Sequence, residues 1–218
     1  MTEKNKPWYD RTHDELINPD INIPKSKHLF DVTLNEVKQC WRVLNEIEVD
    51  GLRLNALYIH KRSFVVGVFL EVYDYSTYDS TIDDFIAAFC DKVPEGTELF
   101  FMPSSNFVKP MSLEDYEAVK YFTPPAIAKG PSEPQTFASV WCSMVKDYTG
   151  SFYCFNRELD FILLFVNGYY CMVAGERDFV EDCVGQDYKA SWQLIIEGDM
   201  DEFKLPSLTK GLTEYRII

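Results

Sequence analysis

The chain has 218 residues, of which 46% are hydrophobic and 15% are aromatic, and this apolar content excludes an intrinsically disordered protein. Its 35 acidic and 21 basic residues give a formal net charge of −14. Because a strongly negative protein repels phosphate backbones and anionic lipid surfaces, we expect neither direct nucleic-acid binding nor membrane association. The length allows either one large domain or two small domains packed together.

Residues 1–30 contain Pro7, Pro19 and Pro24 and show no sustained hydrophobic period, so they are predicted to form an extended N-terminal arm. No apolar stretch near the start of the chain suits a signal peptide, and the longest apolar run, 161–166, is too short to cross a bilayer. We therefore expect a cytoplasmic protein.

The six cysteines are spread singly and show no close pair at redox or zinc spacing. They are Cys40, Cys90, Cys142, Cys154, Cys171 and Cys183. Most of them lie inside apolar runs, so we interpret them as reduced core residues, which agrees with a cytoplasmic location.

Residues 31–102 are predicted to form an N-terminal α+β half. Thr33 and Glu36 have the spacing of a capping box at the start of an amphipathic helix. Two β-rich runs follow, at 52–60 and 63–73, and together they are predicted to form a hairpin.

The segment 64–70 is apolar on both faces, which indicates a central strand covered on each side. A helix over 81–90, with Asp83 and Asp84 in its first turn, is predicted to cover one of those sides. A further strand is expected at 98–102.

Residues 103–134 hold most of the remaining prolines and are interpreted as a connection to a C-terminal α+β half, 135–218. This half repeats the order helix, strands, helix, with strands expected near 151–155, 161–166 and 169–174. Asn167 and Gly168, between the last two strands, give the strongest hairpin signal in the chain. Two explanations of the repeated order stay open: one unit was duplicated, or α+β units of this kind are simply common.

The predicted fold class is therefore α+β, with mainly antiparallel sheet or sheets flanked by helices. Two similar α/β halves packed together are one form that such a fold can take.

No phosphate-binding loop, dinucleotide fingerprint, serine nucleophile elbow, paired-histidine metal helix or calcium loop occurs in the sequence. The three histidines are isolated, and none stands at ligand spacing from another His, Cys or carboxylate. Cys154 and Cys171 lie among aromatic residues, where burial raises the thiol pKa and gives a poor nucleophile. We expect a binding protein without a catalytic site, a metal or a cofactor.

Two acidic segments form the predicted partner-binding site. Residues 71–98 contain eight acidic residues and the single base Lys92, interleaved with tyrosines, and a second acidic face follows at 176–182. Tyrosine supplies contact area and carboxylates pair with Lys and Arg, so a basic protein is the expected partner. The candidate residues are Asp74, Tyr75, Tyr78, Asp79, Asp83, Asp84, Glu176, Asp178, Glu181 and Asp182. The alternative is that these acidic residues bind no partner and only form solvated helix surfaces, where the helix dipole favours acids in the first turn.

The segment 152–161 (FYCFNRELDF), followed by 169–180 (YYCMVAGERDFV), resembles the loosely related bacterial immunity proteins of polymorphic or contact-dependent toxin systems. In this chain, as in several families of such proteins, the strands end at a glycine, and a short acidic helix that contains phenylalanine follows. The resemblance implies a cytoplasmic inhibitor that binds a cognate toxin, often a basic nuclease, and blocks its active site or a required surface. It supplies no diagnostic motif and therefore no site residue.

The sequence thus favours an immunity protein that neutralises a basic toxin domain by means of an acidic surface. Two alternatives stay open. One is an acidic mimic of nucleic acid that inhibits a host or phage DNA-binding protein, and the other is an enzyme that uses scattered carboxylates.

Overall fold

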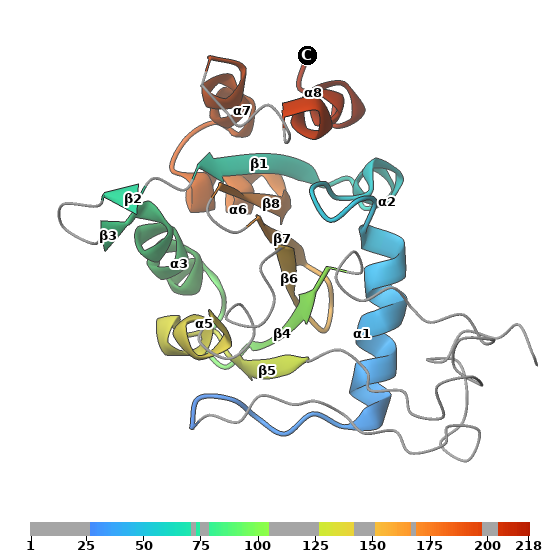
Figure 1. The fold of residues 1–218 in the computed structure, drawn as a ribbon, viewed down its shortest axis with the longest axis vertical. Helices are drawn as coiled ribbons and strands as arrows, with labels where there is room; N and C mark the ends of the chain where they lie inside the picture. Colours follow the sequence, from blue (N-terminus) through green and yellow to red (C-terminus); the bar gives the residue numbers. More distant parts are fainter. Residues whose placement is uncertain are drawn as a thin grey trace, which may run out of the picture.

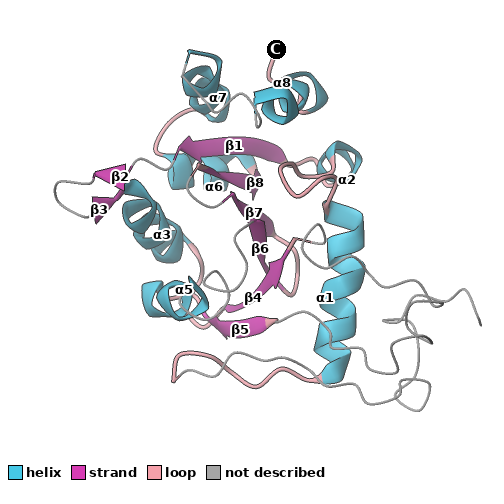
Figure 2. Ribbon diagram, viewed as in Figure 1, coloured by secondary structure: helices cyan, strands magenta, loops and turns pink. Residues whose placement is uncertain are grey.

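The computed structural model describes residues 27–70, 73–74, 79–104, 127–141, 151–166, 169–197 and 205–218. This part of the chain is an α+β fold in which helices flank a six-stranded antiparallel sheet (Figure 1, Figure 2), so the predicted fold class is confirmed. Residues 1–26 of the predicted arm and 105–126 of the predicted connection lie outside the described residues.

The main sheet has the strand order β1-β8-β7-β6-β4-β5, and every neighbouring pair is antiparallel. Its strands are β1 (Val65–Leu70), β4 (Glu98–Pro103), β5 (Ala128–Pro131), β6 (Ser151–Asn156), β7 (Phe161–Val166) and β8 (Tyr170–Gly175). Two short strands, β2 (Tyr73–Asp74) and β3 (Asp79–Ser80), pair separately.

Helices cover both faces of the sheet and one of its edges. They are α1 (Leu34–Ile47), α2 (Ala56–Lys61), α3 (Thr81–Lys92), α5 (Pro134–Val140), α6 (Arg177–Val184), α7 (Tyr188–Glu197) and α8 (Leu205–Glu214). α1 lies on one face, α3 and α5 lie on the other, and α7 and α8 lie beyond β1 (Figure 1). α6 packs against β1, β8 and α3.

Strands from the two predicted halves share one sheet, because β1 pairs with β8 and β4 pairs with β6. The predicted hairpin of 52–60 with 63–73 is therefore wrong. Residues 56–61 form the helix α2, which the side chain of Asn55 caps by accepting a hydrogen bond from Leu57 N at 3.0 Å. β1, which is apolar on both faces, pairs instead with β8, and every residue of β8 is buried.

The predicted β7–β8 hairpin is confirmed by the register that joins Val166 to Tyr170. Its turn residues, Asn167 and Gly168, lie outside the described residues. Every residue of β6, β7 and β8 is buried, because helices or loops cover both sides of these strands.

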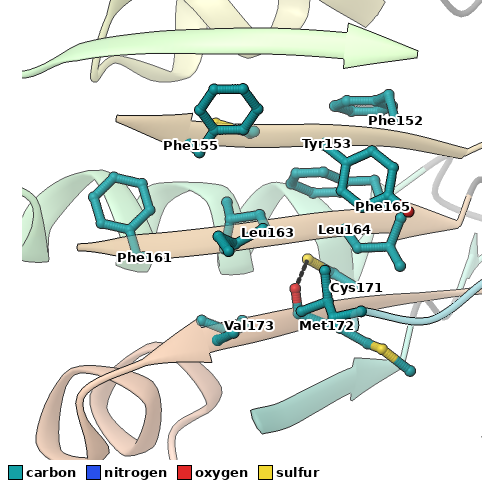
Figure 3. Close-up of a cluster of buried hydrophobic side chains, with 14 of the residues drawn as sticks. Phe152, Tyr153, Phe155, Phe161, Leu163, Leu164, Phe165, Cys171, Met172 and Val173 are labelled. Atoms are coloured by element: carbon teal, nitrogen blue, oxygen red, sulfur yellow. Dashed lines mark hydrogen bonds between the residues drawn. The ribbon is translucent and has the colours of Figure 1, made fainter. Parts of the chain in front are cut away.

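Aromatic side chains fill the core on the face that carries α3 and α5 (Figure 3). The rings of Phe152 and Phe165 stack with their centroids 4.6 Å apart, and Phe85 and Phe137 meet Phe165 edge-on. Full burial of a phenylalanine side chain stabilises the fold by roughly 2–3 kcal/mol, so this cluster contributes a large part of the cohesion between helices and sheet.

The free edge of β1 is covered by side chains of α7. Trp192 Nε1 donates to Val66 O at 2.8 Å, and Val68 N donates to Ser191 Oγ at 3.0 Å. At the opposite edge, Phe30 N donates to Lys129 O of β5 at 2.7 Å. These hydrogen bonds therefore occupy backbone groups at both edges of the sheet that a strand of another chain could otherwise pair with.

Candidate functional site

A pocket with a volume of about 640 Å³ opens at one end of the sheet. It lies where β4 and β7 begin and β6 ends, and residues 94–97, Arg157, Glu158, Asp160 and the start of α6 form much of its wall. Sites for small ligands commonly have volumes of roughly 300–1,000 Å³, so the pocket is large enough for a ligand or for a few residues of another protein.

The loop 157–160, which connects β6 to β7, is held in shape by a buried asparagine. Asn156, only 4% exposed, accepts a hydrogen bond from Asp160 N and donates one to Asp160 Oδ2, both at 2.9 Å. Leu159 has a φ of 58°, a left-handed conformation that costs a non-glycine residue about 1 kcal/mol or more. Arg62 offsets part of that cost by donating from its guanidinium to Glu158 O and Leu159 O.

The pocket wall carries more negative than positive side chains. Its carboxylates belong to Glu95, Glu98, Glu158, Asp160 and Glu176, and its cations to Lys92 and Arg157. Lys92 Nζ is engaged 3.0 Å from Asp182, while Arg157 is 3.0 Å from Glu36 and 3.6 Å from Glu98. Within the described part of the chain, no cation lies at ion-pair distance from the carboxylates of Glu95, Glu158, Asp160 or Glu176.

A buried ionic cluster supports one side of the pocket. Glu36, on α1, accepts hydrogen bonds from Lys129 Nζ at 2.9 Å and from Arg157 at 3.0 Å. It also completes the predicted capping box with Thr33, which is confirmed. Burial alone would raise the pKa of Glu36, but hydrogen bonds from Thr33 and Lys129 outweigh it and hold that pKa below its ordinary value. The charged carboxylate thereby ties α1 to β5 and to the loop after β6.

The two predicted acidic segments lie on neighbouring helices, which contact each other toward the end of α3, through Lys92 and Asp182 and through the rings of Phe89 and Phe179. Asp83 and Asp84 are exposed in the first turn of α3, and Asp178 and Asp182 are exposed on α6, which packs against α3. We call the carboxylates of Asp83, Asp84, Glu176, Asp178, Glu181 and Asp182 the α3–α6 acidic surface.

Glu176, at the start of α6, also lines the pocket, so the pocket adjoins this surface. Glu181 is half-buried, and Asp182 is paired with Lys92. Tyr75 and Tyr78 lie outside the described residues. Asp74 and Asp79 belong to β2 and β3, and their side chains lie outside the described part of the structure.

Sequence reasoning did not include Asn156, Arg157, Glu158 and Asp160 among the candidate residues. The available signal was a short charged loop between two mainly apolar strands, since hairpin loops project from the end of a sheet. It was not decisive, because the other walls of the pocket come from residues about sixty positions earlier and from the start of α6.

The described cysteines are free thiols, and all of them except the half-buried Cys90 are buried. Cys154 and Cys171 are buried, as predicted, and burial raises the pKa of Cys154 well above its ordinary value. Burial also raises the pKa of Cys40 and Cys183 to about 12 and that of Cys90 to about 11. At neutral pH such thiols are protonated and are poor nucleophiles.

No group of three or more His, Cys, Asp or Glu side chains in the described part of the chain is arranged to hold a metal ion. No helix among the same residues has both the length and the apolar character needed to span a membrane.

Comparison of the chain with protein-family models, with curated proteins and with solved structures gave no significant match. The geometry of the pocket and the α3–α6 acidic surface is therefore the basis on which a function can be proposed.

Proposed function

We propose that this protein binds a basic protein partner through the α3–α6 acidic surface and the adjoining pocket, and that it serves as a cytoplasmic immunity protein that neutralises a toxin. The observation that carries the proposal is the set of pocket carboxylates, Glu95, Glu158, Asp160 and Glu176, that have no cation among the described residues at ion-pair distance. A basic partner supplies the missing positive charge.

Electrostatics supports this choice of partner. A net charge of −14 speeds the encounter with a positively charged protein, and added salt weakens the attraction. Many proteins that act on nucleic acid have a cationic groove, and an acidic protein bound there competes with the nucleic acid for the same surface.

The resemblance to immunity proteins supports the same proposal from a separate direction. The segment that carries the resemblance, 152–180, forms β6, β7, β8 and the start of α6. It contributes Asn156, Arg157, Glu158, Asp160, Phe161, Glu176 and Phe179 to the pocket wall.

Affinity capture from the native organism tests the proposal. The protein is immobilised, retained proteins are washed at low and then at high salt, and each is identified. The proposal requires one basic protein that leaves at high salt, that is toxic when expressed alone, and whose toxicity disappears when this chain is co-expressed.

A capture experiment that retains no basic protein at low salt would contradict the proposal. Retention of a general DNA-binding protein without toxicity would contradict the immunity role and would favour the mimic of nucleic acid instead. A variant in which Asp83, Asp84 and Asp178 are changed to Asn serves as the bait control and should retain less of the basic protein.

A further inference from the structure

The pocket at the end of the sheet combines carboxylates with aromatic side chains. Phe64 and Phe179 are half-buried and line the wall together with Phe161, which is 3% exposed and stacks on Phe179. A cation gains both from pairing with carboxylates and from contact with the face of an aromatic ring. We infer that this pocket receives an arginine side chain of the basic partner, an inference that rests on the proposed function.

Two arginines of the chain itself, at and beside the pocket wall, show how a guanidinium fits this environment. Arg62 lies over the ring of Phe64, with its Cζ 5.3 Å from the ring centroid, and donates to two carbonyl oxygens of the loop 157–160. Arg157 lies over the ring of Phe100 at 5.8 Å and pairs with Glu36 and Glu98. Both arginines combine a ring face with oxygen acceptors, and the pocket wall holds the same kinds of group, aromatic side chains beside carboxylates.

The charge balance calls for a cation from outside the described chain. Arg157 is drawn away by the buried Glu36, and Lys92 by Asp182, so both cations of the wall are already engaged. Asn156 Nδ2 donates to the carboxylates of Glu158 and Asp160, but no cation among the described residues pairs with Glu158, Asp160 or Glu176. A bound guanidinium supplies the opposite charge, which favours binding.

Arginine suits the pocket better than lysine for a geometric reason. A guanidinium is planar, donates up to five hydrogen bonds and can satisfy two carboxylates while its face rests on a ring. A lysine ammonium is compact and more strongly hydrated, so it loses more on desolvation and gains less from the ring. The volume of about 640 Å³ also leaves room for the residues that flank the arginine in a protein loop.

The pocket is built to keep its shape when it is empty. Asn156 fixes the loop from below, Arg62 fixes its backbone, and Glu36 fixes Arg157. A site with fixed walls loses little conformational entropy on binding, so more of the interaction free energy appears as affinity.

Titration of the purified full chain with N-acetyl-arginine amide, followed by NMR, tests the inference. We expect chemical-shift changes centred on Gly96, Asn156 and Glu158, with a Kd of about 1 mM. N-acetyl-lysine amide should bind roughly tenfold more weakly, and the uncharged N-acetyl-citrulline amide should not bind measurably.

Paired variants show whether the pocket is responsible. Changing Glu158 and Glu176 to Gln removes two exposed carboxylates of the wall and should weaken arginine binding at least about fivefold. The matched variant with Asp31→Asn and Glu46→Gln removes the same charge from exposed positions that do not line the pocket and should leave binding unchanged.

Equal binding of the arginine and lysine probes, or shift changes that follow net charge and ignore the pocket, would overturn the inference. The two proposals fail separately. If a basic partner binds equally well to the Glu158→Gln, Glu176→Gln variant, the arginine pocket is refuted and the proposed function stands. If no basic partner is found, the proposed function is refuted, and the probe titration still decides whether the pocket binds arginine.

Discussion

The carboxylate of Glu36 on α1 lies 2.9 Å from the ammonium of Lys129 on β5, and the side chains are 11% and 10% exposed. Removal of one partner from a buried ion pair leaves the other charge uncompensated, which costs more than the intact pair contributes. We therefore predict that Glu36→Gln lowers the free energy of unfolding by about 3 kcal/mol near pH 7, measured by urea denaturation.

The effect of pH on this variant follows from the lowered pKa of Glu36. On acidification the unfolded chain takes up the proton before the folded chain does, so the stabilisation is complete above the ordinary pKa and is lost as pH falls through the lowered one. The difference in unfolding free energy between the natural protein and Glu36→Gln should shrink steadily below about pH 5. Glu46→Gln, at an exposed position of the same helix, is the control and should change stability by less than about 0.5 kcal/mol. If the difference in unfolding free energy between the natural protein and Glu36→Gln stays constant with pH, this account of Glu36 is contradicted.

A second prediction concerns the covered edge of β1. Ser191, which is fully buried, accepts a hydrogen bond from Val68 N, and Ser191→Ala leaves that amide without an acceptor. We expect a loss of about 1–3 kcal/mol in unfolding free energy, with faster hydrogen exchange at the Val68 amide. Lys189→Ala, at an exposed position of α7, should change neither quantity. Unchanged exchange at Val68 in the Ser191 variant would show that α7 does not protect this edge.

A third prediction concerns the contact between β1 and α6. A Cβ atom added at Gly67 would lie 2.8 Å from Val180 Cγ1 and 3.1 Å from Val184 Cγ1, so Gly67→Ala forces the helix away from the strand. The expected cost is about 1–3 kcal/mol, measured by thermal unfolding. In a Val180→Ala background the same change should cost at least about 1 kcal/mol less, because the removed methyl groups leave space. Strictly additive effects would exclude the steric explanation.

Local patterns in the sequence predicted the elements that depend on neighbouring residues. The capping box at Thr33 and the pair Asn167-Gly168 correctly indicated α1 and the β7–β8 hairpin. α2 was missed because its six residues are too few to show a helical period and were interpreted as part of a β-rich run. The cap at Asn55 and the helix-forming residues Ala56, Leu57 and Lys61 favour the helix that is observed.

The sequence patterns could not predict which distant strands pair, and that pairing determines the candidate site. The partner of β1 is β8, about one hundred residues later, and nothing in either strand identifies the other. The pocket depends on β4, β6 and β7 lying side by side, which brings Glu98, Asn156 and Phe161 to one end of the sheet. The acidic helices were predicted individually, but their packing against each other was not.

The most direct test of the central claim is the affinity for the basic partner obtained by capture, measured by calorimetry at about 50 mM and about 300 mM salt. Two baits are compared with the natural protein. One has Asp83, Asp84 and Asp178 changed to Asn, and the other has Asp31→Asn, Glu46→Gln and Glu133→Gln at exposed positions outside the α3–α6 acidic surface.

The account predicts that salt weakens binding of the natural protein about tenfold or more, that the first variant loses a similar factor at low salt, and that the second stays within about twofold of the natural protein. Equal affinity of all three proteins at both salt concentrations would contradict recognition through the α3–α6 acidic surface.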